Sequence, residues 1–127
     1  MTPLTKKLAL KPGMSLCVLD APAGYQVALN ALAGEVTLVK TLRGEIDRLQ
    51  IFVTRKAQLE KKLKALKAAM GPKSALWVSY PKANGLGSDL NRDLLREWLD
   101  TKGLTAVSQV AVDDVWSALR FKLQEER

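Results

Sequence analysis

The sequence contains no histidine and only one cysteine, Cys17, which lies in an apolar run. The absence of histidine excludes catalytic triads, imidazole acid–base catalysis and histidine-ligated metal sites. A single cysteine forms no intrachain disulfide and no thiolate metal cluster. No apolar segment precedes Lys11, so we expect neither a signal peptide nor a transmembrane helix. The sequence therefore predicts a cytoplasmic protein without a metal site and without membrane association.

Acidic residues are outnumbered: 13 Asp and Glu stand against 20 Lys and Arg, which gives a formal net charge of +7. Such a balance favours acidic partners such as nucleic acid, nucleotides or a membrane surface, although many soluble proteins are equally basic for colloidal reasons. The composition, with 47% hydrophobic and 26% charged residues, is that of a globular protein. A length of 127 residues predicts one domain, covering residues 1–127.

Apolar runs of strand length alternate with segments of helical period. We predict strands at four apolar runs, 15–20, 35–39, 49–53 and 74–79. Helices are predicted at 22–33, 55–70 and 89–102, the last capped by Ser88 or Asp89. Two final strands, 105–112 and 115–123, are joined so closely that they must be antiparallel. The alternation predicts a Rossmann-like α/β fold, a mostly parallel sheet with a C-terminal antiparallel hairpin strand.

Two segments resemble class I methyltransferases that use S-adenosylmethionine. Residues 8–20 resemble the lead-in helix, Lys-Pro-Gly turn and first strand of that fold, and residues 70–81 resemble its fifth-strand region. Residues 77–82, 89–92 and 116–121 together resemble a family of small bacterial proteins of unknown function. The resemblance implies a shortened methyltransferase-like three-layer sandwich, and the closer family implies no established activity.

The cofactor positions of the resembled fold are altered here. They correspond to Asp20, Gly24, Tyr25 and Lys40. A methyltransferase has a glycine-rich turn after its first strand, whereas this chain has only Gly24 and places Pro22, which lacks a backbone donor, at the helix start. Its second strand ends in a ribose-binding acid, whereas Lys40 donates hydrogen bonds. We therefore expect no cofactor and no tight binding of S-adenosylmethionine.

The connection from Lys40 to Asp47 is too short for a crossover helix. In the resembled fold a helix and a strand stand at this point. Their absence predicts a sheet face without helical cover, which a second copy of the chain would bury in a homodimer.

A ligand site is predicted at the carboxyl edge of the sheet, where ligands of open α/β sheets bind. The candidate residues offer flat apolar surface, charge-assisted donors and carboxylates: Tyr80, Lys82, Asp89, Arg92, Asp113 and Trp116. They favour a small anionic or nucleotide-like ligand. The simpler readings are that Asp20 caps a helix, that Asp113 and Asp114 form a turn, and that the cations lie at the surface.

Three functions are consistent with these features. The first is a non-catalytic, methyltransferase-like binding or assembly protein with no catalytic residues. The second is a small enzyme that binds S-adenosylmethionine or a nucleotide. The third is a nucleic-acid-associated protein, binding weakly and without sequence specificity through the lysines of segment 55–70, Lys56, Lys61, Lys62, Lys64 and Lys67. The sequence favours the first over an enzyme.

Overall fold

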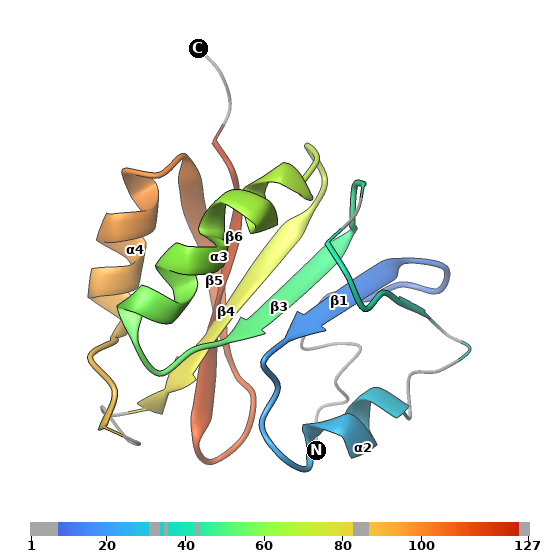
Figure 1. Cartoon of the computed structure of the whole chain (residues 1–127), viewed down its shortest axis with the longest axis horizontal. Coiled ribbons are helices and arrows are strands. Elements are labelled where there is room, and N and C mark those ends of the chain that lie inside the picture. The colour runs from blue at the N-terminus through green and yellow to red at the C-terminus, as the bar shows by residue number, and fades with distance from the viewer. Residues whose placement is uncertain (1–7, 31–33, 35, 43, 83–86, 125–127) are drawn as a thin grey trace.

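The protein is built on one six-stranded mixed sheet (Figure 1). The computed structural model describes residues 8–30, 34, 36–42, 44–82 and 87–124. The strands are β1 (Ser15–Leu19), β2 (Thr37–Leu38), β3 (Arg48–Phe52), β4 (Ala75–Pro81), β5 (Leu104–Ala111) and β6 (Trp116–Leu123), in the order β2-β1-β3-β4-β6-β5. Of these six strands, β6 points in the opposite direction to the rest and pairs antiparallel with β4 and β5. The predicted Rossmann-like sheet with a C-terminal antiparallel strand is confirmed.

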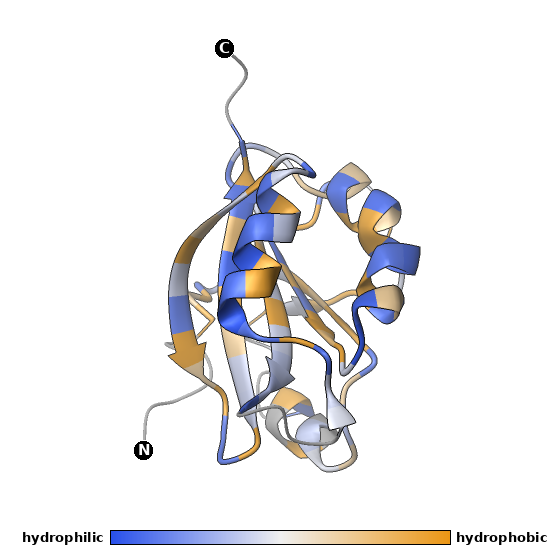
Figure 2. Ribbon diagram, turned by 90° about the vertical axis from the view of Figure 1, so that its left-hand side faces the viewer, coloured by the Kyte–Doolittle hydropathy of each residue, from blue (hydrophilic) through white to orange (hydrophobic). Residues whose placement is uncertain are grey.

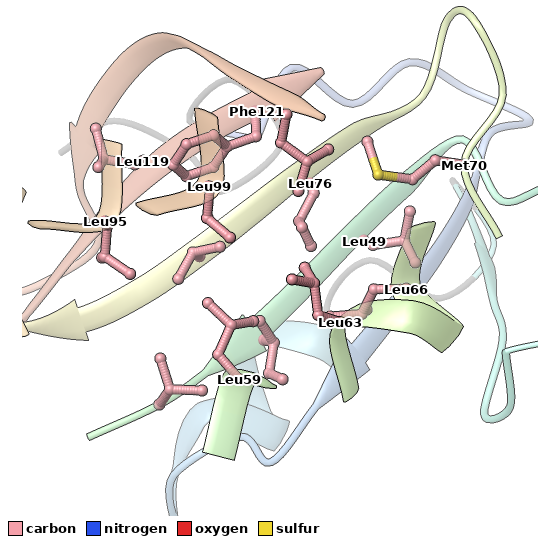
Figure 3. Close-up of a cluster of buried hydrophobic side chains, with 14 of the residues drawn as sticks. Leu49, Leu59, Leu63, Leu66, Met70, Leu76, Leu95, Leu99, Leu119 and Phe121 are labelled. Carbon is pink, nitrogen blue, oxygen red and sulfur yellow. The ribbon is translucent and has the colours of Figure 1, made fainter. Parts of the chain in front are cut away.

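One face of the sheet is covered by α3 (Lys56–Ala68) and α4 (Arg92–Asp100). Both helices are amphipathic, with hydrophobic residues on one side and hydrophilic residues on the other (Figure 2). Their buried leucines meet the apolar residues of β3, β4 and β6 (Figure 3): Leu59, Leu63, Leu66, Leu95, Leu99, Leu49, Leu76, Leu119 and Phe121. Each fully buried side chain of this kind contributes about 1.5–3 kcal/mol relative to an exposed one.

The helix α4 differs from its prediction by three residues at its start. It begins at Arg92, and its cap is Asn91, whose side-chain oxygen accepts a hydrogen bond from the Leu94 backbone at 2.8 Å. The expected cap at Ser88 or Asp89 is therefore wrong. The buried residues of α4 are Leu95 and Leu99, and Leu90, just before the helix, is buried as well. Trp98 is only partly buried, and the Lys56 ammonium lies 4.8 Å from its ring centroid.

The opposite face is covered by the lead-in segment 8–10 and by α2 (Tyr25–Asn30). Its core is aromatic: the Tyr25 and Phe52 ring centroids lie 4.7 Å apart, and those of Phe52 and Trp116 lie 5.1 Å apart, both edge-on. The Trp77 indole N–H donates to the Leu8 carbonyl at 3.2 Å. The result is the expected three-layer arrangement.

The connection between β2 and β3 contains no helix among its described residues, 39–42 and 44–47. Instead Val39 and Leu42 pack against the α3-side core, and Ile46 is buried within it. The connection thus supplies apolar cover of its own. Less of the sheet face is therefore uncovered than the sequence led us to expect. The homodimer that was predicted to bury that face stays a prediction.

Among the described residues, no helix is both long and apolar enough to cross a membrane. Over those same residues, no three His, Cys, Asp or Glu side chains come together in a group that could hold a metal ion.

Candidate functional site

The carboxyl ends of β1, β3 and β4 lie at one edge of the sheet, because these strands are parallel. In Figure 1 this edge is where their arrowheads end. It brings together the turn after β1, the segment that leads from β3 into α3, and Lys82 after β4. Helices α3 and α4 both begin at this edge, so their positive N-terminal ends face it.

Asp20 lies directly after β1 and is paired with Lys62 of α3. The carboxylate Oδ2 and the ammonium Nζ are 2.7 Å apart, with side chains 50% and 40% exposed. The expected capping role finds no support, since the described partner of this carboxylate is Lys62. Asp20 has φ of +57°, in the left-handed region that non-glycine residues rarely occupy. Such conformations concentrate at functional sites.

The other three cofactor positions differ in their surroundings. Gly24 is exposed at φ +91°, and a side chain there would meet open space. Lys40 is exposed at the end of the second strand region. Tyr25, in contrast, is 9% exposed and donates from its hydroxyl to Gln50 Oε1 at 2.7 Å. Burial raises the pKa of Tyr25 to about 12. A cofactor contact through Tyr25 does not agree with this position in the core.

A cavity of about 250 Å³ lies at the carboxyl end of β4, beside the start of α4. It is lined by Tyr80, Pro81, Lys82, Leu90, Asn91, Arg92, Gln109 and Ser117. The Gln109 amide bridges two buried hydroxyls, donating to Tyr80 at 3.3 Å and to Ser117 at 3.0 Å. No carboxylate is among these lining residues, whereas Lys82 and Arg92 are cations. The cavity therefore suits an anionic group.

Tyr80, Lys82 and Arg92 line this one cavity, whereas the other three candidates lie elsewhere. Asp89 accepts a hydrogen bond from the Lys56 backbone at 3.0 Å, at the start of α3. Asp113 accepts from the backbone of Val115 and of Trp116, each at 2.8 Å, so it forms the hairpin turn. Trp116 packs on Phe52 on the other face.

The residues that the sequence missed are Asn91, Gln109 and Ser117. Alternation along β6 explains one of them: neighbouring side chains point to opposite faces, so if Trp116 faces α2, Ser117 faces the cavity. That signal was readable from the strand pattern. The position of Gln109 depends on a register shift in β5 between Ala106 and Ser108, for which the sequence carries no comparable signal.

The lysines of segment 55–70 separate into two groups. Lys56 lies over Trp98, Lys62 pairs with Asp20, and Lys67 donates to the carbonyl of Lys102. Lys61 and Lys64 are exposed. The lysine face is therefore in part a set of structural contacts rather than one continuous charged surface.

The fold is similar to that of solved S-adenosylmethionine-dependent methyltransferases. The DhpI complex with S-adenosylhomocysteine has a TM-score of 0.62 at 12% identity, over 98% of this chain and 83% of that one. A Burkholderia thailandensis 1,6-didemethyltoxoflavin-N1-methyltransferase with bound S-adenosylhomocysteine gives 0.62 at 12%, over 96% and 75%. Methanococcus jannaschii fibrillarin, a pre-rRNA processing protein, gives 0.59 at 12%, over 99% and 70%. No family model and no curated protein matches the sequence.

These likenesses confirm the expected fold, and at such low identity they carry the fold alone. They also correct one expectation. The sequence led us to expect no cofactor, but two of these structures hold S-adenosylhomocysteine, and a third neighbour, LepI, is a complex with S-adenosylmethionine. The altered turn after β1 is thus not sufficient ground to exclude this cofactor.

Proposed function

We propose that the chain binds S-adenosylmethionine or S-adenosylhomocysteine at the carboxyl edge of the sheet, as a methyltransferase-like protein. The observation that carries the proposal is the Asp20–Lys62 pair. It stands at the end of β1, beside the turn containing Gly24, in a fold whose solved neighbours include complexes with these molecules.

The pair fits the amino-acid end of such a molecule. That end carries an ammonium and a carboxylate, and Asp20 and Lys62 offer one charge of each sign within 2.7 Å. Both side chains are substantially exposed, so each reaches solvent as well as its partner. Hydrogen bonds in which both groups are charged are about twice as strong as neutral ones. The ion pair would open to place Asp20 on the ammonium and Lys62 on the carboxylate.

The adenosine end has less to bind it. Lys40 and Thr41 are exposed after β2, and neither supplies the acid that accepts hydrogen bonds from ribose hydroxyls. Thr41 offers one hydroxyl acceptor. We therefore expect the amino-acid end to contribute the larger share of the affinity.

Calorimetry with S-adenosylhomocysteine, with adenosine as the second ligand, tests the proposal. Asp20→Asn and Lys62→Gln should each weaken binding of S-adenosylhomocysteine about ten- to hundredfold, the range for a charged hydrogen bond. Adenosine, which lacks the amino-acid end, should bind all variants alike. Lys61→Gln removes a neighbouring exposed lysine and is the matched control. The proposal fails if the unaltered protein does not bind S-adenosylhomocysteine, or if the control weakens binding as much.

The cavity beside α4 supports a second part of the proposal, the binding of an anionic group. Its lining holds two cations and no carboxylate, and the whole sequence has no histidine. Histidine and carboxylate are common general bases at neutral pH, and the lining has neither. We therefore favour a partner molecule that is already anionic at neutral pH, bound with or without chemistry. Incubation with labelled S-adenosylmethionine and an anionic acceptor separates an enzyme from a non-catalytic binding protein, since only the enzyme transfers label.

A further inference from the structure

We propose that a groove at the opposite, amino edge of the sheet binds the phosphate backbone of a nucleic acid strand. The groove encloses about 570 Å³ between the second half of α3 and the turn that follows α4. It is lined by Glu60, Leu63, Lys64, Lys67, Thr101, Lys102 and Gly103. Helices α3 and α4 both run away from the carboxyl edge, so this groove is separate from the cofactor turn and from the Tyr80 cavity.

The lining is strongly cationic. Three lysines face a single acid, Glu60, and Leu63 provides apolar surface between them. The acid of α4 nearest to the turn, Asp100, accepts a hydrogen bond from the Gln124 side chain at 3.0 Å and is not among the lining residues. With three cations and one acid, the groove favours a polyanionic ligand, and repulsion by Glu60 lowers the affinity for that ligand at one end of the groove.

Lys67 is held in place at the groove by the chain itself. Its ammonium donates to the Lys102 carbonyl, which leaves two of its three N–H donors for another acceptor. Gly103 makes this approach feasible, because a Cβ at that position would lie 3.0 Å from Lys67 Nζ. Gly103 also has φ of +85°, which favours glycine. A positioned ammonium loses less side-chain entropy on binding than a free one does.

The density of negative charge favours a phosphate strand over an acidic peptide. Lys64, Lys67 and Lys102 line one groove, and each can bind an anionic group. A nucleic acid strand carries one negative charge on every nucleotide, so it offers phosphates to these lysines whatever its sequence. An acidic peptide does so only where its sequence places Asp or Glu towards the groove, since alternate side chains of an extended peptide face away.

The lining of the groove offers no flat surface on which bases stack. No aromatic side chain is among its lining residues, so base stacking is absent there, and lysine contacts to phosphate carry no sequence information. We therefore expect weak, sequence-independent binding that falls steeply with salt.

Fluorescence anisotropy with a labelled single-stranded RNA of about 16 nucleotides tests this proposal. Titrations run from about 50 mM to about 200 mM salt, because the slope of log K against log salt is about 0.7 per neutralised phosphate. The groove variant combines Lys64→Gln, Lys67→Gln and Lys102→Gln. The control combines Lys11→Gln, Lys73→Gln and Lys122→Gln, three exposed lysines outside the lining, and so removes the same charge.

The groove variant should lower the salt slope by about 2 and weaken binding at least tenfold, while the control changes affinity by less than about threefold. Equal weakening by both triple variants would show diffuse charge attraction and overturn the groove. So would an absence of binding at the lowest salt, or equal competition per charge by poly-glutamate. Because Lys67 has an internal contact, Lys64→Gln alone is measured as well. It should lower the slope by about 0.7, and circular dichroism checks that every variant is folded.

Discussion

The two faces of the sheet are built from different chemistry. Towards α3 and α4, strands β3 and β4 present Leu49, Ile51, Leu76 and Val78, and the hydroxyl of Tyr80 near the end of β4 is the polar group of this face. Towards α2, the same strands present Gln50 and Ser79, both completely buried. The Gln50 amide accepts from Tyr25 and donates to the Ser79 hydroxyl at 3.0 Å. The two faces therefore differ in what they can do: apolar packing stabilises the fold, and buried hydrogen bonds position particular segments.

On the α2 face, which we call the polar face, buried hydrogen bonds fix the positions of chain segments that the non-directional hydrophobic effect alone would not fix. Arg48 donates to three backbone carbonyls, those of Ala9, Asp47 and Lys73, and so ties the lead-in to two turns. Tyr25 directly follows Gly24, so its bond to Gln50 anchors the turn that holds the candidate cofactor residues. Satisfied buried polar groups are directional, whereas apolar packing is not. We infer that the α2 face positions the site and that the α3 face supplies most of the stability.

The largest expected effect is on the apolar face. Leu76→Ala should lower the free energy of unfolding by about 2–5 kcal/mol, because Leu76 is completely buried and its removal leaves a cavity. Val27→Ala, at a side chain that is 74% exposed, should change it by less than about 0.5 kcal/mol. Urea denaturation measures both. Similar values would show that Leu76 contributes no more stability than an exposed side chain, against the role given to the apolar face.

At high pH the polar face should weaken first. The pKa of Tyr25 is about 12 in the folded chain, raised from 10.0 by burial and by Asp113, with the Gln50 hydrogen bond acting in the opposite direction. A raised pKa means that the folded state holds the proton more tightly, so its stabilisation is complete below pH 10 and is lost as the pH rises towards 12. Two pKa units correspond to about 2.7 kcal/mol. In Tyr25→Phe the free energy of unfolding, measured by urea denaturation, should fall less steeply between these pH values. An unchanged slope would show that Tyr25 does not carry it.

A smaller loss is expected for Gln50→Leu. It leaves the hydroxyls of Tyr25 and Ser79 without their buried partner, at a cost of about 1–3 kcal/mol. Adding Tyr25→Phe removes one orphaned hydroxyl and should recover part of this loss, so the two changes should not be additive in a double-mutant cycle. Full additivity would mean that the hydrogen bond contributes nothing.

The sequence predicted the apolar face better than the polar one. Buried strands and the helix 55–70 follow from runs and spacings of leucine, which act the same way in any context. The start of α4 could not be predicted from the sequence, because Ser88, Asp89 and Asn91 are all residue types that cap helices. Asp89 instead accepts a hydrogen bond from the backbone of Lys56, and Asn91 is the cap. In the site, parallel strands were enough to bring Tyr80 near Arg92. The predicted place of Asp113 and Trp116 in the site depended on the register of the hairpin, because a shift of one residue turns every side chain to the other face.

The smallest effect on stability is expected at the edge between the faces. Arg92 is exposed, and its one described ionic partner is Asp93 of the same turn, with Nε and Oδ1 3.5 Å apart. Arg92→Ala should therefore change the free energy of unfolding by less than about 0.5 kcal/mol, since exposed pairs contribute little. The same variant should weaken binding of an anionic probe such as pyrophosphate by about 1.5–3 kcal/mol, the range for a charged hydrogen bond, because Arg92 lines the Tyr80 cavity. Calorimetry and thermal melting measure the two quantities on one sample, with Arg96→Ala, an exposed arginine of the same helix outside the lining, as the control. If Arg92→Ala lowers the melting temperature and leaves pyrophosphate binding intact, Arg92 is structural. The carboxyl edge of the sheet would then contribute to the stability of the fold, as its two faces do.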